Sequence, residues 1–313
     1  MVSPSTDKSA ARESLRPPPP GDLIALGVAV IFISFSGPLI AATAAPVLAI
    51  AFWRCFIGSG LTGIWVLVRE RRQLAALGKR EIKLIIFAGI LLGLHFVTWI
   101  PSLAFTSVAA STALVATQPI WAAFIARARG IQIPRAAWVG IFIALAGVIF
   151  LTGVDVQMDT RHLIGDLLAL AGAVFAAAYV SVAEQVRQSV STGTMTFIVY
   201  GVSAVTVLPL VAIFQQELFG FSAQAWIYIL AITLGAQLLG HTLINKVLAN
   251  SSATFVSMAI LFEMPGAAIV AAIWLGQAPP VAIYPAAALI LLGIVIVIKA
   301  SSRSKQPLES PPV

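Results

Sequence analysis

Long apolar stretches separated by short polar breaks run along nearly the whole chain, from Asp22 onward. Ten stretches can be distinguished, at residues 22–42, 46–68, 82–105, 107–127, 136–153, 163–186, 192–214, 224–246, 253–275 and 281–299. Each has about the 20 residues with which a helix crosses roughly 30 Å of hydrocarbon. Backbone groups find no water in hydrocarbon, so spanning segments of this kind are helical. The pattern predicts an all-α integral membrane protein with ten transmembrane helices.

The composition agrees with this prediction, and the charges orient the chain. Of 313 residues, 59% are hydrophobic and 10% are charged, whereas soluble domains carry about 25% charged residues. Of the 19 Lys and Arg residues, all except Arg54 and Arg161, hence 17, fall on one side of the predicted topology. Positive residues mark the cytoplasmic side, so the net charge of +7 reflects topology. We therefore expect cytoplasmic termini, a bacterial-type inner (plasma) membrane, contact with membrane lipids and no nucleic-acid partner.

The second half of the chain repeats the first. His95 stands 24 residues before Pro119 and His241 stands 24 residues before Pro265, so an offset of 146 relates the two pairs. The halves also begin alike, with GDLIALGVAV from Gly21 and GDLLALAGAV from residue 165. Five helices per half is an odd number, so the copies cross the membrane in opposite senses. We expect two inverted five-helix repeats, 21–154 and 155–300, between a disordered cytoplasmic tail at 1–20 and a cytoplasmic tail at 301–313.

Few polar side chains lie within the apolar stretches. Such groups are costly in hydrocarbon and normally face a protein interior or a water-filled cavity. His95 and Trp99, four residues apart, share one helix face. We expect these residues to bind a small-molecule substrate: Trp53, His95, Trp99, Thr117, Gln118, Gln237 and His241. Ordinary packing is the alternative role of the tryptophans and histidines.

Glu263 and Arg54 are charged residues inside predicted spans. Glu263 lies near mid-membrane, where ionisation of a carboxyl group is heavily penalised. This position suits a site that couples transport to protons or to another ion. An Arg54–Glu263 ion pair, or a neutral acid, that only joins helices is the alternative interpretation. Both residues are candidates for ion coupling.

Pro119 and Pro265 each interrupt a predicted helix beside its polar residues. A proline removes one backbone donor and lets the helix bend. We expect this mirrored pair to act as hinges; a fixed packing kink is the alternative.

We expect no metal and no cofactor. His95 and His241 lack a third ligand at helical spacing, as a metal site would require. The chain also lacks a Gly-x-x-x-x-Gly-Lys phosphate-binding loop, so ATP is not expected to drive it directly.

Several segments resemble the EamA-type transporters of the drug/metabolite transporter superfamily. They are, in order, Ala45-Pro46, Arg54, LAFTSVAASTAL at 103–114 leading to Pro119-Ile120, and ANSSA at 249–253 leading to Pro265. The resemblance covers about residues 21–299 and implies ten helices in two inverted repeats. It also implies a central cavity walled mainly by helices 1, 3, 4, 6, 8 and 9, and alternating-access transport of small metabolites, often export. Many members have a glutamate directly before the two prolines, where this chain has Gln118 and Met264.

The leading hypothesis is a secondary active transporter that moves a small metabolite or drug-like molecule by alternating access, as an exporter and not as an enzyme. A passive pore is one alternative. A polytopic membrane enzyme is another, with Ser59 and a histidine as its reactive groups. The tripeptide Gly58-Ser59-Gly60 also suits close helix packing.

Overall fold

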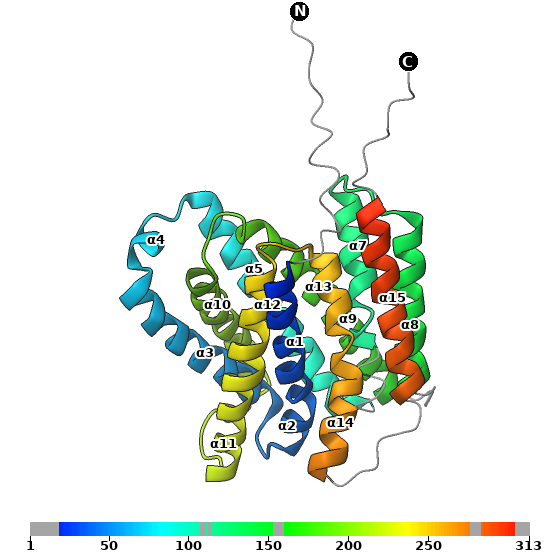
Figure 1. Ribbon diagram of the computed structural model, residues 1–313. Coiled ribbons are helices and arrows are strands. Elements are labelled where there is room, and N and C mark those ends of the chain that lie inside the picture. The colour runs from blue at the N-terminus through cyan, green and yellow to red at the C-terminus, as the bar shows by residue number, and fades with distance from the viewer. Residues whose placement is uncertain (1–18, 107–110, 112–113, 153–159, 276–282, 304–313) are drawn as a thin grey trace, which may run out of the picture.

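The computed structural model describes residues 19–106, 111, 114–152, 160–275 and 283–303, and this part of the chain is helical with no strand (Figure 1). The helices of the first half are α1 (Pro20–Ser34), α2 (Ser36–Ala42), α3 (Val47–Arg69), α4 (Arg71–Ala75), α5 (Lys79–Phe105), α7 (Gln118–Ala128) and α8 (Arg135–Thr152). Those of the second half are α9 (Thr160–Val186), α10 (Thr192–Ile213), α11 (Ala223–Ile232), η2 (Thr233–His241), α12 (Thr242–Val247), α13 (Ala253–Ile260), α14 (Glu263–Leu275) and α15 (Ile283–Arg303).

Most of the predicted spans coincide with one helix or with helices joined end to end. Among the described residues, 6 helical segments are long and apolar enough to cross a membrane: Pro20–Ala42, Val47–Arg69, Lys79–Phe105, Thr160–Val186, Thr192–Ile213 and Ala223–Val247. Shorter apolar helices cover Arg135–Gly147, Ala253–Ala267 and Tyr284–Val297. The protein is therefore an integral membrane protein, all-helical over the residues that the structure describes. Most of the predicted tails, and part of the fourth predicted span, lie outside the described residues.

Two of the predicted spans are broken where the prolines stand. In the span predicted at 107–127, a turn at Ala116 and Thr117 precedes α7, which carries Pro119 in its first turn. In the span predicted at 253–275, a turn at 261–262 separates α13 from α14, with Pro265 again in the first turn. Proline is tolerated there because the first backbone N–H groups of a helix lack intrahelical partners. The helix interruptions predicted beside Pro119 and Pro265 are therefore present in the structure.

The helix containing Gln237 departs from the predicted regular α-helix. Residues Thr233–His241 form a π-helix, in which the backbone N–H of Thr242 donates to the carbonyl oxygen of Gln237, five residues earlier. The hydroxyl groups of Tyr200 and Thr242 donate to the same carbonyl, at 3.1 and 3.3 Å. Three donors thus share one oxygen, which favours the wider turn. Such π-helical segments are rare and often lie at functional sites.

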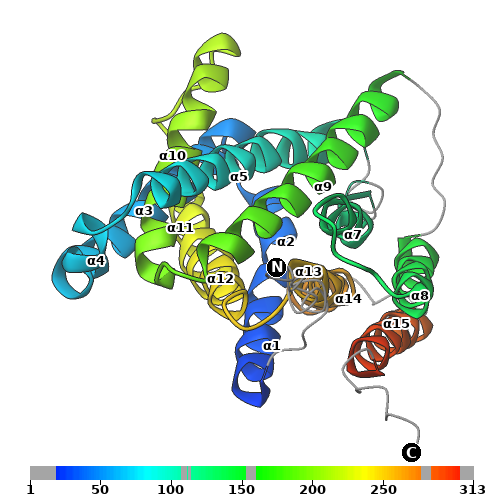
Figure 2. The same ribbon diagram turned by 90° about the horizontal axis from the view of Figure 1, so that it is seen from above.

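Helices α8 and α15 pack against each other at the side of the bundle (Figure 2). A Cβ atom added at Gly140 would lie 2.6 Å from the carbonyl oxygen of Gly293, and one at Gly147 would lie 2.8 Å from that of Ala286. The offset of 146 maps Gly140 onto Ala286 and Gly147 onto Gly293. Exchanging the two halves therefore turns the Gly140–Gly293 contact into the Ala286–Gly147 contact. Two antiparallel helices related by a twofold axis behave in this way.

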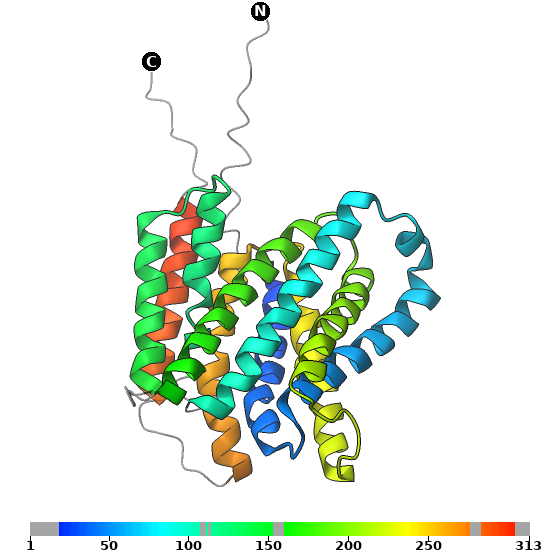
Figure 3. The same ribbon diagram turned by 180° about the vertical axis from the view of Figure 1, so that it is seen from behind.

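The remaining long helices and two half-length helices surround the middle of the bundle. Helices α5 and α9 run side by side across one face of the molecule (Figure 3), and α3 packs on α10. Helix α7 runs from the middle of the bundle toward one end, and α14 runs from the middle toward the other (Figure 1). Two helix N-termini therefore meet at mid-depth.

Candidate functional site

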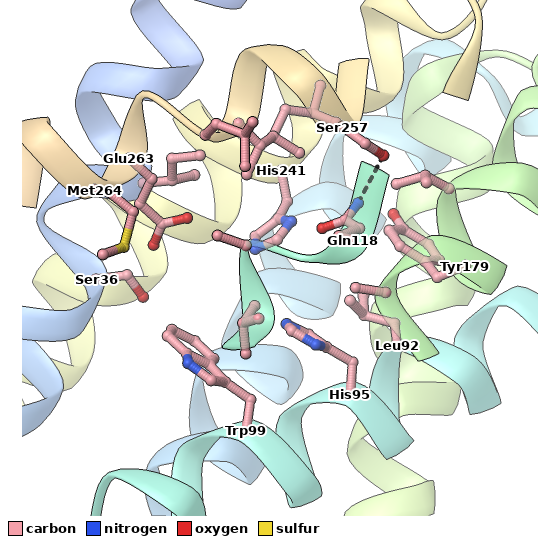
Figure 4. Close-up of a pocket in the computed structure, with 18 residues that line it drawn as sticks. Ser36, Leu92, His95, Trp99, Gln118, Tyr179, His241, Ser257, Glu263 and Met264 are labelled. Atoms are coloured by element: carbon pink, nitrogen blue, oxygen red, sulfur yellow. Dashed lines mark hydrogen bonds between the residues drawn. The ribbon is translucent and has the colours of Figure 1, made fainter. Parts of the chain in front are cut away.

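A narrow cavity lies where α1, α2, α5, α7, α9, η2, α12, α13 and α14 meet. Its volume is about 60 Å³, counted as the space that the centres of water molecules can reach, which is room for a few waters. Figure 4 shows His95 and His241 projecting into it from opposite sides. In that view Ser36, Trp99 and Glu263 lie toward one end, and Gln118, Ser257 and Tyr179 toward the other. Much of the remaining wall is apolar.

Equivalent positions of the two halves line this cavity together. At the offset of 146, the lining pairs are His95 with His241, Val115 with Leu261 and Gln118 with Met264. At the offset of 144 found for the first helix of each half, Ser36 corresponds to Val180, which also lines the cavity. Equivalent residues of the two halves therefore meet at this cavity.

His95 is held firmly in the wall formed by α5. Its Nδ1 lies 3.0 Å from the carbonyl oxygen of Gly172 on α9, and because a carbonyl only accepts, Nδ1 carries the hydrogen. In the neutral ring, Nε2 is then the acceptor. The imidazole also stacks on the indole of Trp99, with centroids 5.6 Å apart and 9° between the planes.

His241 ends the π-helix and is held less tightly. Its ring meets the ring of Phe96 edge to face, with centroids 5.8 Å apart. No hydrogen bond joins it to any residue that the structure describes. The two histidines occupy equivalent positions in the repeats but differ in how they are anchored.

Arg54 is wholly buried behind the cavity wall, with 0% of its surface exposed. Its Nε donates to Gln237 Oε1 at 2.9 Å, and Nη1 donates over a long 3.4 Å to the hydroxyl of Ser36, which lines the cavity. The guanidinium also lies over the ring of Phe96, 4.3 Å from its centroid, as cation–π attraction favours. Arg54 thus joins α3 to α2, α5 and η2.

Glu263 stands at the N-terminus of α14, and its carboxyl group lies in the cavity wall (Figure 4). It has neither a hydrogen bond nor an ion pair with another described residue. Arg54 acts on it electrostatically, yet no Arg54–Glu263 ion pair is formed. An ion pair that joins the helices is therefore not the role of Glu263 in this conformation.

Two hydrogen-bonded pairs lie around the cavity, the first joining the two halves and the second lying within the second half. Gln118 Nε2 donates to the hydroxyl of Ser257 at 2.9 Å, and the hydroxyl of Tyr179 lies 2.8 Å from Asn245 Oδ1. Sequence reasoning missed Ser36, Tyr179 and Ser257 as cavity residues. The offset of 146 offered a signal for Ser257, because it maps Ser111, in the conspicuous segment before Pro119, onto that position.

Three of the predicted substrate-binding residues, Trp53, Thr117 and Gln237, do not line the cavity. The indole of Trp53 donates to the carbonyl oxygen of Leu218 at 2.7 Å and packs among aromatic rings. The hydroxyl of Thr117 donates to the carbonyl oxygen of Leu114 at 2.6 Å and accepts from the indole of Trp121. Gln237 is buried behind the wall beside Arg54. The candidates that line the cavity are His95, Trp99, Gln118, His241 and Glu263.

Two further sequence hypotheses concern Ser59 and metal binding. The hydroxyl of Ser59 donates to the carbonyl oxygen of Phe197 at 2.9 Å, which favours the close-packing interpretation over a nucleophile. Within the described ranges, no group of three or more His, Cys, Asp or Glu residues could hold a metal ion.

A separate polar cluster lies at the end of the bundle that carries α4. Glu70, which follows α3, accepts hydrogen bonds at Oε2 from the hydroxyl of Ser191 and from the backbone N–H and hydroxyl of Thr194, the last two at 2.9 and 3.0 Å. Trp65 donates to Oε1 at 3.2 Å. Burial opposes ionisation of Glu70, but these hydrogen bonds outweigh it and lower the pKa of the carboxyl below its ordinary value. Glu70 thereby fastens the start of α10 to the end of α3.

Comparison with known proteins agrees with the fold and the repeat. The model of the EamA-like transporter family matches residues 19–153 and again 163–299. A search of curated proteins found no match. A solved crystal structure, described only as that of a protein, is similar with a TM-score of 0.75 at 16% identity, over 91% of this chain and 99% of that chain; at this identity the likeness shows the fold alone. The two family matches cover most of the chain, which therefore belongs to the EamA-like transporter family, the membrane transporters of the drug/metabolite transporter superfamily.

Proposed function

We propose that this protein is a secondary active transporter that moves a small metabolite or drug-like molecule by alternating access, in the direction of export. The observation that carries the proposal is the cavity lined by equivalent positions of the two halves, such as His95 and His241. A site at the interface of inverted repeats can be exposed to each side in turn by rocking one repeat against the other.

The arrangement of the helices supports two inverted five-helix repeats within ten transmembrane helices. Helices α7 and α14, which follow the two prolines, run from mid-depth toward opposite ends (Figure 1). The paired helices α8 and α15 carry glycine contacts that exchange under the repeat offset. Antiparallel equivalent helices are what an in-plane twofold axis produces.

The charges support an orientation with both termini in the cytoplasm of a bacterial-type cell. Helix α4 and the α7–α8 connection lie at the end of the bundle where α1 begins and α15 ends (Figure 1). These segments and the adjoining ends of α7 and α8 carry Arg71, Arg72, Arg127, Arg129 and Arg135. Cytoplasmic loops are enriched in Lys and Arg.

The cavity is constricted in this conformation. Its volume of about 60 Å³ is too small for a metabolite, so substrate enters only when the walls move. The turns before Pro119 and Pro265 are the proposed hinges, because the helix is already interrupted there. His95, Trp99, Gln118 and His241 would contact the substrate, and Glu263 with Arg54 would couple its movement to protons or another ion.

Counterflow in liposomes tests the proposal. Purified protein is screened by thermal shift against small metabolites, and liposomes containing it are loaded with an unlabelled compound that stabilises it. We expect the unlabelled compound inside to accelerate uptake of the labelled compound, because the binding site of a carrier returns to the outer side with internal compound bound. Protein-free liposomes and the variant Pro119→Ala, Pro265→Ala serve as controls, and the variant should bind but exchange slowly. Uptake without acceleration would indicate a pore, and chemical conversion of the compound would indicate an enzyme.

A further inference from the structure

Three buried nitrogen donors around the cavity lack an acceptor among the described residues. They are Arg54 Nη2, Gln237 Nε2 and Trp99 Nε1. The amide of Gln237 is oriented by Arg54, because a guanidinium only donates and therefore binds the amide oxygen, leaving the amide nitrogen free. Buried donors are normally satisfied, so unsatisfied ones require an explanation. All three are donors, which indicates a ligand that accepts hydrogen bonds.

The charges near these donors also favour an anion. Arg54 donates only to the neutral partners Gln237 and Ser36, and a buried cation is normally paired with a carboxylate or another anion. Glu263 is the carboxyl group that acts electrostatically on Arg54, but the two side chains form no ion pair. The N-termini of α7 and α14, both at the cavity, present the positive ends of their dipoles.

The position of Arg54 allows it to reach a ligand. Ser36 lines the cavity and receives the long 3.4 Å hydrogen bond from Nη1. This bond is weak, so a small movement of α2 or of the arginine brings the guanidinium to the cavity surface. Trp99 already lines that end of the cavity, as does Glu263 (Figure 4).

Resting on the transport function proposed above, we propose that the substrate carries one carboxylate on a small apolar body, and that this carboxylate pairs with Arg54 while Glu263 takes up a proton. When Glu263 is ionised in the free protein, its carboxylate balances the charge of Arg54 at a distance. When the substrate carboxylate pairs with Arg54, the proton neutralises Glu263, so the complex stays electrically balanced. Leu92, Ile244, Ile260 and Met264 provide apolar walls for the body of the substrate.

Glu263 must be distinguished from the other titratable groups that face the cavity or Arg54. These are Cys55 on α3, His95 on α5, Tyr179 on α9, Tyr200 on α10 and His241 on η2. On the helices packed against α14, Asp22 of α1 and Tyr284 and Lys299 of α15 lie near helix ends. A histidine that became charged would also favour an anion at low pH. The Glu263→Gln variant separates these two sources of pH dependence, because it removes the carboxyl group but keeps both histidines.

Benzoate and benzamide are matched probes for this test, since they differ only in charge and donor pattern at the carboxyl carbon. Binding to the full-length protein in detergent is measured by thermal shift and by calorimetry between about pH 10 and pH 7, where benzoate remains ionised. We expect wild type to bind benzoate about tenfold more tightly than benzamide. We also expect the benzoate affinity to rise by up to about tenfold per pH unit as the pH falls, because one proton is taken up.

The variants give the sharper result. Glu263→Gln should bind benzoate at every pH as tightly as wild type does at low pH, because the amide stands for the protonated acid. Arg54→Gln should lose the preference for benzoate over benzamide, and Arg54→Lys should keep part of it. Equal affinity for the two probes in wild type, weaker benzoate binding in Glu263→Gln, or a pH dependence that persists in Glu263→Gln would overturn the proposal.

The outcomes also separate this inference from the transport function. If benzoate binds as expected but carboxylates show no counterflow, transport fails and the carboxylate site stands. If neutral or cationic compounds show counterflow while benzoate and benzamide bind alike, the carboxylate site fails and transport stands.

Discussion

Helix α5 and the segment α11–η2–α12 occupy equivalent places in the two halves, but they are built differently. Helix α5 is α-helical over 27 residues, and its His95 is fixed by Gly172 and Trp99. The equivalent His241 ends a π-helix of 9 residues and has no hydrogen bond within the described ranges. The repeat therefore preserved the position of the histidine but not the contacts that hold it. We infer that the first half provides a rigid wall and the second half a deformable one.

The close packing of α5 on α9 gives the prediction with the largest effect. A Cβ atom added at Gly165 would lie 2.7 Å from the backbone nitrogen of Thr106, just beyond α5. Backbone cannot move aside as a side chain can, so Gly165→Ala should destabilise the protein by about 1–3 kcal/mol. Thermal unfolding in detergent measures the loss.

The matched control for this variant lies in η2. A Cβ atom at Gly235 would meet Phe32 Cδ1 at 3.4 Å, an ordinary contact, and alanine is favoured over glycine in a helix by up to about 1 kcal/mol. Gly235→Ala should therefore leave the melting temperature unchanged or raise it. If Gly165→Ala unfolded no earlier than Gly235→Ala, the proposed contrast between a rigid and a deformable wall would be wrong.

The π-helix should depend on Tyr200, which gives an intermediate effect. Its hydroxyl donates to the carbonyl oxygen of Gln237 and lies 2.9 Å from the hydroxyl of Thr242. Tyr200→Phe removes these bonds and should cost about 1 kcal/mol, while hydrogen exchange accelerates in η2 and not in α5. Tyr179→Phe, which removes a hydroxyl paired with Asn245, is the comparison variant. Equal acceleration in both helices would contradict a local role of Tyr200.

Sequence alone predicted the elements whose cause is local. Hydrophobic length predicted the helices, and Pro119 and Pro265 predicted the interruptions, because proline acts on its own turn. The π-helix was not predictable in this way, since it depends on a hydroxyl group of α10 that bonds to Gln237. A polar residue also does not reveal which neighbour it meets. For this reason Trp53 was expected at the cavity but lies against Leu218, whereas His95 and His241, which the repeat singled out, both line it.

Helix α10 contacts both of the contrasted helices. Glu70, which follows α3 and accepts hydrogen bonds from the start of α10, gives the prediction with the smallest effect. Ser203 of α10 donates to Gly89 of α5, and Tyr200 of α10 holds η2. Because its hydrogen bonds lower the pKa of Glu70, the ionised carboxyl stabilises the fold above the ordinary glutamate pKa. This stabilisation is lost as the pH falls through the lowered value.

Glu70→Gln should therefore reduce stability near neutral pH by only about 0.5 kcal/mol, because the carboxylate is partly solvated. The difference from wild type should shrink as the pH falls below the ordinary glutamate range, which unfolding midpoints measured against pH would show. Glu81→Gln, another acidic residue at the same end of the bundle, is the control for a general charge effect. Hydrogen exchange in Glu70→Gln should accelerate more in η2 than in α5, because α5 also packs along α9, whereas the π-helix is held by the Tyr200 hydroxyl of α10. An equal response in both helices would mean that α10 supports the two walls alike.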